Sequence, residues 1–354
     1  MIKYIGSKRR LVPRIVALAA AIPGARTALD LFTGSTRVAQ GLKEAGLHVT
    51  TNDLATYSEL LGTTYIATDA RRVDRAPIEA LIEELNALPG ERGYFTRTFC
   101  EDARYVQPKN GMRVDAIRAR IETITSDATT RAILLTALLE ATDRVDSTTG
   151  LQMAFLKGWS TRSHRTLSLR MPLLLDGPGA VLRSDAREAV RTLATSHMYD
   201  VAYLDPPYNQ HSYYRNYHVW ETLVRGDAPV PYGIARKRED CRTTRSPFNS
   251  RQFAWEAMCD VVRAVPARHV VLSFSDEGFF SIGAIRALLI ERFGEVAAVP
   301  VPSKRYVGAK IGIHDLRGAL VGEVGHLHNT EWLFVAGPDA ADIVSVVTEE
   351  AEVA

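Results

Sequence analysis

The segment Asp205-Pro206-Pro207-Tyr208 constrains the fold more than any other stretch of this chain. It directly follows the apolar run 201–204, whose length and flanks predict a buried parallel strand. Two successive prolines cannot continue a strand, because each fixes φ and lacks an N–H group to donate. A rigid turn at the carboxyl end of a parallel strand is where open α/β sheets bind their ligands. The sequence therefore predicts such a sheet, with a binding site at this edge.

The turn combines a carboxylate, a backbone carbonyl and an aromatic ring in a fixed relation. Asp205 and the carbonyl of Pro206 can accept the two N–H bonds of an exocyclic amine, while Tyr208 stacks on a planar ring. Pro207 completes the rigid turn. An ordinary strand-ending turn with an exposed tyrosine explains the same residues equally well, so the motif alone leaves both interpretations open.

A second unit of strand, turn and helix is expected near the amino terminus. A strand from residue 27 runs into a turn of small residues around Gly34, a helix follows at 37–44, and a strand at 48–52 ends in Asp53. Asp53 lies 53 − 34 = 19 residues beyond Gly34. A glycine that allows close approach, with an acid about 20 residues later for ribose hydroxyls, is typical of a nucleoside site.

The turn lacks the glycines of a dinucleotide site. Thr36 and Val38 stand where further glycines would let a pyrophosphate approach the backbone. A nucleoside without phosphates therefore fits better, and S-adenosylmethionine is the candidate. A turn that serves only the packing of strand and helix remains the alternative.

The alternation of strands and helices lapses between about residues 65 and 178, where the sequence predicts helices at 78–88, 116–124 and 129–145. A helical block of this size within an α/β pattern indicates an insertion. The alternation then resumes, and the strands expected along the whole chain number about seven, as in a doubly wound sheet.

A basic loop ends the helical block. Its cations and its one tryptophan could contact DNA phosphates and base edges; they are Lys157, Trp159, Arg162, Arg165 and Arg170. A solvated loop explains the same residues. A second basic stretch spans 236–245.

Composition gives weaker limits. The 354 residues carry 43 Lys and Arg against 41 Asp and Glu, so the net charge of +2 says nothing about a nucleic-acid partner. The spacing of Cys100, Cys241 and Cys259 indicates neither a zinc site nor a disulfide framework. No metal is expected, and a reducing cytoplasm fits. No apolar stretch has the length of a membrane span, so no membrane partner is expected.

Taken in order, the motifs resemble the Dam-like, alpha-group family of DNA adenine-N6 methyltransferases. They are Lys-Tyr-Ile-Gly-Ser-Lys at 3–8, Asp-Leu-Phe-Thr-Gly-Ser at 30–35, Asp53, the helical insert, Asp-Pro-Pro-Tyr at 205–208 and the closing Asn-Thr-Glu-Trp-Leu-Phe at 329–334. The resemblance implies a doubly wound, seven-stranded methyltransferase fold that uses S-adenosylmethionine. The catalytic domain would comprise 1–64 and 179–340, a helical target-recognition insert 65–178, and a tail 341–354.

The resemblance also implies roles for individual residues. Those that would contact or surround the cofactor are Tyr4, Lys8, Asp30, Phe32, Gly34, Asp53 and, more loosely, Asp185. Asp205 would lie between the cofactor and the target base. Thr36 replaces the second glycine of the family's cofactor loop, and Gly6-Ser7 stands where the family often has two glycines.

The expected reaction is methyl transfer to the N6 amine of adenine in double-stranded DNA, after the base is flipped out of the duplex. The tyrosines Tyr213, Tyr214 and Tyr217 could support the flipped base, although helix packing explains Tyr217 equally well. Three alternatives remain: an RNA exocyclic-amine methyltransferase, a catalytically silent DNA-binding relative and a nicotinamide-dependent oxidoreductase. The DNA recognition sequence, the oligomeric state and a cognate restriction endonuclease as partner stay open.

Overall fold

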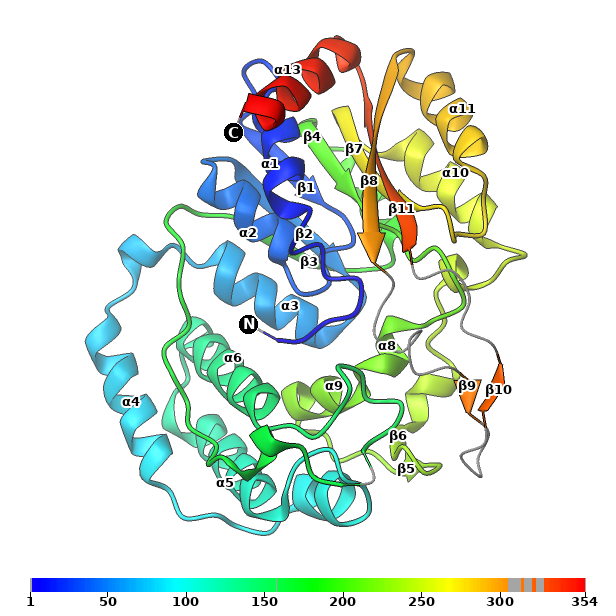
Figure 1. Ribbon diagram of the computed structural model, residues 1–354. Helices are drawn as coiled ribbons and strands as arrows, with labels where there is room; N and C mark the ends of the chain where they lie inside the picture. The colour runs from blue at the N-terminus through cyan, green and yellow to red at the C-terminus, as the bar shows by residue number, and fades with distance from the viewer. Residues whose placement is uncertain (1, 157, 305–312, 315–319, 323–327, 354) are drawn as a thin grey trace. The chain divides into compact units, whose positions relative to one another are not determined.

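The computed structural model describes residues 2–156, 158–304, 313–314, 320–322 and 328–353. Seven strands form one sheet in the order β3-β2-β1-β4-β7-β11-β8 (Figure 1). Their bounds are β1 (Thr27–Asp30), β2 (His48–Asp53), β3 (Ala180–Arg183), β4 (Tyr199–Leu204), β7 (Ala267–Ser275), β8 (Val296–Lys304) and β11 (His328–Ala336). The predicted α/β fold with a seven-stranded sheet is confirmed.

The sheet combines parallel and antiparallel neighbours. β1 pairs with β2, β2 with β3, and β4 with β7 in parallel, whereas β11 runs antiparallel to both β7 and β8. Parallel neighbours need a crossover connection, which α2 provides between β1 and β2. Two short antiparallel pairs lie outside the sheet: β5 (Pro231–Tyr232) with β6 (Lys237–Arg238), and β9 (Ile313–His314) with β10 (Leu320–Gly322).

Twelve α-helices lie in the described ranges. Their bounds are α1 (Val12–Ala20), α2 (Arg37–Glu44), α3 (Thr56–Gly62), α4 (Arg75–Ala87), α5 (Pro108–Ile124), α6 (Ala128–Arg144), α7 (Ala186–Leu193), α8 (Tyr213–Asn216), α9 (His218–Arg225), α10 (Ala254–Ala264), α11 (Ile282–Phe293) and α13 (Ala340–Val353). The helix expected at 37–44 has these bounds. α3 and the π-helical turn Thr63–Ala67 that continues it were not expected from the sequence.

The chain divides into two compact units. Unit 1 comprises residues 1–12, 26–189 and 211–246; unit 2 comprises 13–25, 190–210 and 247–354. Compact packing is a different criterion from the predicted division into catalytic domain, insert and tail, which stays a prediction. Residues 340–353, most of the expected tail, form helix α13.

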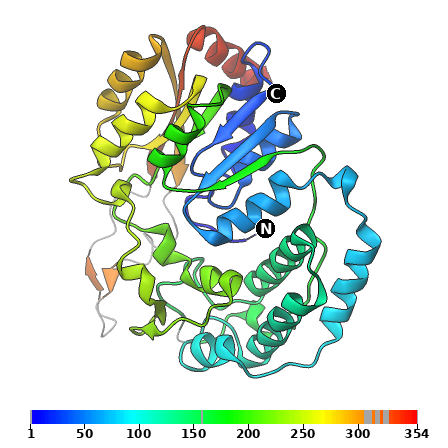
Figure 2. The ribbon, with the colours of Figure 1, turned by 180° about the vertical axis from the view of Figure 1, so that it is seen from behind.

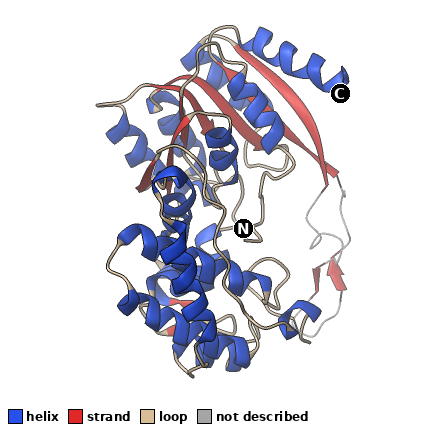
Figure 3. Cartoon of the chain, turned by 90° about the vertical axis from the view of Figure 1, so that its left-hand side faces the viewer, coloured by secondary structure: helices blue, strands red, loops and turns tan. Residues whose placement is uncertain are grey.

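Unit 1 contains β1, β2, β3 and the helical region between β2 and β3. α6 is its central helix, since residues 132–143 are all buried, and it packs against α5, α3 and α9. α4 packs against α5 and α6 (Figure 2). Figure 3 shows how predominantly helical this region is. A helix apolar on all sides must be enclosed by other elements, so α6 forms the core of the unit.

Unit 2 contains β4, β7, β11 and β8, with α11 against β7, β8 and β11, and α13 against β8 and β11. Residues 201–204 of β4 are fully buried, as the continuous apolar run of a parallel strand predicts. None of the helices in the described ranges combines the length and apolar character that crossing a bilayer requires.

Candidate active site

The carboxyl ends of β1, β2 and β3 meet at one edge of unit 1. Asn52, buried at the end of β2, donates from Nδ2 to the carbonyls of Leu31 (3.2 Å) and Ser184 (3.2 Å). The N–H group of Ser184 in turn donates to the carbonyl of Asp53 (3.2 Å). One amide side chain thus holds the three strand ends together, and the loops that follow them lie side by side.

Asp53 joins two of these loops. Its Oδ2 accepts a hydrogen bond from the N–H group of Gly34 (2.9 Å), and its Oδ1 accepts one from that of Ala55 (3.0 Å). Burial raises the pKa of the Asp53 carboxyl above its ordinary value, and the N–H groups of Ala55 and Gly34 oppose this shift. The N–H group of Leu54 and the side chain of Ser58 also lower this pKa through hydrogen bonds, so donors from both loops orient the carboxylate.

Gly34 needs to be glycine for two reasons. Its φ is 50°, in the left-handed region, and a Cβ atom there would lie 3.0 Å from the Tyr4 ring. The amino-terminal segment therefore lies directly over the turn, and the structure brings Tyr4, Gly34 and Asp53 together.

Thr36 stands where the resemblance expects a glycine. It takes φ 60° and ψ 14°, a left-handed conformation that β-branched residues rarely adopt. The buried Oγ1 donates to the carbonyl of Ser35 (2.7 Å) and accepts from Nε2 of Gln40 (2.8 Å). These bonds help to hold a backbone shape that glycine would take without strain, so the strand, turn and helix are all retained.

Tyr4 belongs to a cluster of four tyrosines. Its ring stacks on Tyr217 (centroids 4.5 Å apart) and Tyr213 (5.4 Å), and its hydroxyl lies 3.3 Å from that of Tyr57. The Tyr217 hydroxyl accepts from the N–H group of Ile5 (2.5 Å) and donates to the carbonyl of Gly150 (3.1 Å). Tyr217 is 1% exposed, so it packs the amino-terminal segment in place.

The other predicted cofactor residues have varied surroundings. Asp30 is buried and accepts from Oγ1 of Thr33 (2.9 Å). Lys8 is buried, and its carbonyl accepts a hydrogen bond from the N–H group of Val12, the first residue of α1. Phe32 is half-buried in the turn. Asp185 accepts from the N–H group of Arg187 (3.0 Å), so it caps the start of α7.

The Asp205-Pro206-Pro207-Tyr208 turn follows β4 in unit 2. Asp205 comes directly after Leu204, which is paired with Leu272 of the parallel strand β7. Asp205 and Pro207 are half-buried, and Pro206 is buried. The turn therefore begins at the carboxyl edge of the sheet, as the sequence predicts.

Tyr208 is held against the end of β7. Its carbonyl accepts from the N–H group of Phe279 (3.0 Å), and its half-buried ring contacts Phe274 edge to face, with the centroids 5.9 Å apart. The next residue, Asn209, accepts from Nδ2 of Asn249 (2.9 Å) at its carbonyl. These contacts fix the ring that is predicted to stack on a planar substrate.

The residues of the predicted DNA loop differ in their surroundings. Arg162 donates from Nε to the buried carboxylate of Asp146 (2.7 Å) and from Nη2 to the carbonyl of Thr148 (2.5 Å). Arg165 and Arg170 are exposed, and Trp159 is half-buried. Lys157 lies outside the described residues.

The second basic stretch also contains a structural cation. Arg238 is 2% exposed and forms ion pairs with Asp227 (2.7 Å) and Asp240 (3.0 Å). The sequence predicts no role for these acids. It also predicts none for Tyr57, which lies on α3 beside Tyr4, or for Glu221, which contacts the start of α3. The sequence did offer one indication that Glu221 has a special role, because this acid lies within the apolar segment His218–Val224. Across the described ranges, no three His, Cys, Asp or Glu residues come together to hold a metal ion.

Comparison with known proteins shows related chains. M.NlaIII, a type II methyltransferase of Neisseria lactamica, is 29% identical over 321 residues, which cover 87% of this chain and 93% of the relative. M.CviAII of Paramecium bursaria Chlorella virus 1, also a type II methyltransferase, is 27% identical, with 78% and 83% covered. The modification methylase StsI of Streptococcus sanguinis is 28% identical over 86% of this chain, which spans only 48% of that longer protein.

A solved S-adenosylmethionine-dependent methyltransferase from Agrobacterium tumefaciens aligns with 95% of this chain and 63% of its own, at a TM-score of 0.39 and 10% identity. The family model for D12 class N6 adenine-specific DNA methyltransferases matches residues 4–276. This match begins in the amino-terminal segment and continues beyond the Asp-Pro-Pro-Tyr turn. It includes the loops that follow β1, β2, β3 and β4. The chain therefore belongs to the D12 class N6 adenine-specific DNA methyltransferase family.

Proposed function

We propose that this protein is a site-specific methyltransferase that modifies the N6 amine of adenine in duplex DNA as the target base is flipped out of the helix. Its family uses S-adenosylmethionine as methyl donor. The observation that carries the proposal is the Asp-Pro-Pro-Tyr turn at the carboxyl end of β4. There an acid, a proline carbonyl and an aromatic ring follow a buried strand, in a chain of this family.

The carboxyl edge of unit 1 fits the nucleoside part of the donor. Asp53 would hold the ribose hydroxyls, because its half-buried carboxylate is already oriented by the N–H groups of Gly34 and Ala55. Gly34 leaves the backbone of the turn accessible, and Asp30 and Phe32 would line the adjoining wall. Tyr4, Lys8 and Asp185 complete the proposed set. When bound, the donor supplies a methyl group activated by its sulfonium charge.

The protein's own contribution to methyl transfer would come from the turn. The amine of adenine is a poor nucleophile because its lone pair is delocalised into the ring. Asp205 and the Pro206 carbonyl would accept its two N–H bonds and favour a tetrahedral nitrogen, which directs the lone pair outward. Tyr208 would stack on the base, and Pro207 keeps the turn rigid. Alignment of this kind can contribute about 7 to 11 kcal/mol.

Alanine at position 34 is expected to weaken donor binding. Alanine would have to adopt φ near 50°, and its Cβ atom would lie 3.0 Å from the Tyr4 ring. The turn or Tyr4 must therefore move. Strain of this type costs about 1 to 3 kcal/mol. Calorimetric titration of Gly34→Ala with S-adenosylmethionine should give a dissociation constant about 10-fold higher. Gly24→Ala is the control, because it has positive φ but open space around its Cβ position.

The basic loop is proposed to contact DNA phosphates through its exposed cations. Replacing Arg165 or Arg170 with alanine should lower the slope of log binding constant against log salt by about one for each lost contact. Arg75→Ala is the control: this exposed arginine pairs with Glu79 on α4. An unchanged slope in both loop variants would assign the loop to solubility alone.

Arg162 is expected to behave differently from its neighbours in the loop. Its removal leaves the buried carboxylate of Asp146 without one of its cations. Loss of loop order should therefore accompany any loss of DNA affinity. Lys157 and Trp159 remain proposed contacts of the same loop.

A cognate restriction endonuclease and a cytoplasmic location remain predictions. Sequencing DNA from cells that express the protein, with modified bases identified, tests the function directly. N6-methyladenine at one recurring sequence is the expected result. Methylated RNA with unmodified DNA would instead support the RNA alternative, and no new modification would support the silent one.

A further inference from the structure

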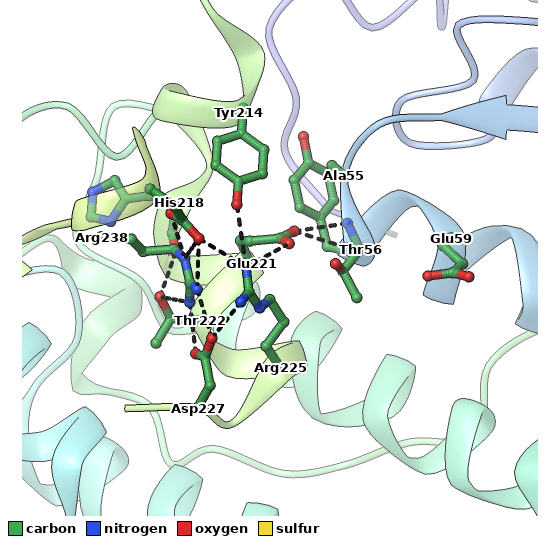
Figure 4. Close-up of polar contacts among 12 residues, drawn as sticks. Ala55, Thr56, Glu59, Tyr214, His218, Glu221, Thr222, Arg225, Asp227 and Arg238 are labelled. Atoms are coloured by element: carbon green, nitrogen blue, oxygen red, sulfur yellow. Dashed lines mark hydrogen bonds and ion pairs between the residues drawn. The ribbon is translucent and has the colours of Figure 1, made fainter. Parts of the chain in front are cut away.

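Glu221 is a buried acid that caps a helix far from it in the sequence. It lies on α9, where residues 218–224 are all buried, and is 1% exposed. Its Oε2 accepts hydrogen bonds from the N–H groups of Thr56 (2.9 Å) and Tyr57 (3.3 Å), the first two residues of α3 (Figure 4). The residue at the capping position of α3, Ala55, has no side chain that could do this. The cap therefore comes from 165 residues along the chain.

The helix start that Glu221 caps also holds the proposed ribose-binding acid. Asp53 accepts from the N–H group of Ala55, and Glu221 accepts from the next two. Three successive N–H groups thus orient two carboxylates: that of Asp53, which also bonds the Gly34 turn, and that of Glu221 on α9. Tyr57 additionally places its hydroxyl 3.3 Å from that of Tyr4. Movement of this short segment would displace both Asp53 and the support of Tyr4.

A group of charges surrounds the acid. Arg225 Nη1 lies 3.9 Å from Oε1 of Glu221 and 2.9 Å from Asp240, and its Nη2 lies 2.8 Å from Asp227. Arg238 pairs with the same two aspartates. Burial raises the pKa of the Glu221 carboxyl, while the hydrogen bonds from Thr56 and Tyr57 and the charges of Arg238 and Arg225 oppose that shift.

Stability alone gives little reason to keep an acid here. Burying a carboxylate is costly, and well-packed apolar residues often replace buried ion pairs without loss. A serine, aspartate or asparagine at position 55 could cap α3 locally. What Glu221 provides instead is a fixed link between α9 and the segment that carries Asp53.

We infer that Glu221 is a positioning residue of the cofactor site: by capping α3 it holds the Asp53–Tyr57 segment in the geometry that binds S-adenosylmethionine. The inference rests on the proposed role of Asp53. Replacing Glu221 should therefore weaken donor binding, whereas DNA binding and the rate at saturating donor should stay near those of the wild type.

Three variants test this inference. Glu221→Ala should raise the dissociation constant and the KM for S-adenosylmethionine about 10-fold, as expected for lost hydrogen bonds to a charged group. Glu221→Gln should stay within about 3-fold of the wild type, because its Oε1 can accept the same bonds. Glu59→Gln is the matched control: Glu59 also lies on α3, is drawn apart from Glu221 in Figure 4, and pairs with Arg183 (3.3 Å).

The outcomes separate the possibilities. A purely structural role would lower the melting temperature of Glu221→Ala while the folded protein keeps its donor affinity, and that result overturns the inference. If Glu221→Ala does not fold, Glu221→Asp keeps the charge on a shorter side chain, and wild-type donor affinity in that variant has the same meaning. If Asp53→Ala weakens donor binding but Glu221→Ala leaves it unchanged, only the inference about Glu221 is rejected. Unchanged binding in Asp53→Ala removes the proposed role of Asp53 and this inference with it.

Discussion

Replacing Asp205 with alanine is expected to lower methyl transfer to adenine by at least about 100- to 1,000-fold, the typical cost of losing one group that acts on the reacting centre. The fold and most of the DNA affinity should survive. The reason is that DNA affinity comes mainly from phosphate contacts, whereas Asp205 would act on one amine. Incorporation of a tritiated methyl group, measured beside a DNA-binding titration, checks both statements.

Two further variants sharpen this test. Asp205→Asn keeps the shape of the side chain, but an amide NH2 group replaces one acceptor oxygen and faces the N–H bonds of the substrate amine. This variant should therefore be nearly as inactive as Asp205→Ala. Asp200→Asn is the matched control, because Asp200 lies on the same strand, is half-buried and approaches Arg268 at 3.8 Å. Methylation at the wild-type rate in either Asp205 variant would show that Asp205 is not the acceptor.

Asp53→Ala is expected to weaken S-adenosylmethionine binding by about 1.5 to 3 kcal/mol, the value of hydrogen bonds to a charged group. The N–H groups of Gly34 and Ala55 lose their acceptor at the same time, so the turn loosens as well. Calorimetry measures the change. Asp74→Ala is the control, because that acid caps α4 in a comparable way, accepting from the N–H group of Ala76. A folded Asp53 variant with unchanged affinity would remove Asp53 from the site.

The pH dependence provides an independent check on Asp53. Its pKa is raised by burial, so the folded protein binds this proton more readily than the unfolded chain does. The contribution of Asp53 to folding stability therefore increases as the pH falls through the raised pKa. Donor affinity should change in the opposite direction, since a protonated Asp53 is a poorer acceptor. Asp53→Asn should lose this pH-dependent part of the affinity.

The sequence determined the parts of the protein that depend on neighbouring residues. The proline pair ended β4, the apolar run before it predicted burial, and the 19-residue interval predicted that Gly34 and Asp53 come together, as the 2.9 Å hydrogen bond confirms. The order of the motifs identified the family, and membership in it decides against the RNA methyltransferase and oxidoreductase alternatives. These inferences succeeded because strand period, proline geometry and short loops are local properties.

Only the tertiary structure decided how distant residues share these sites. The placement of β11 between β7 and β8, the stacking of Tyr4 on Tyr217, the pairing of Arg162 with Asp146 and the cap that Glu221 gives to α3 each join different elements. No periodicity or spacing encodes such contacts, because they depend on how whole elements pack. The left-handed Thr36 gives the same lesson at short range: its side chain disfavours that conformation, and its buried hydrogen bonds and the packing of the turn help to maintain it.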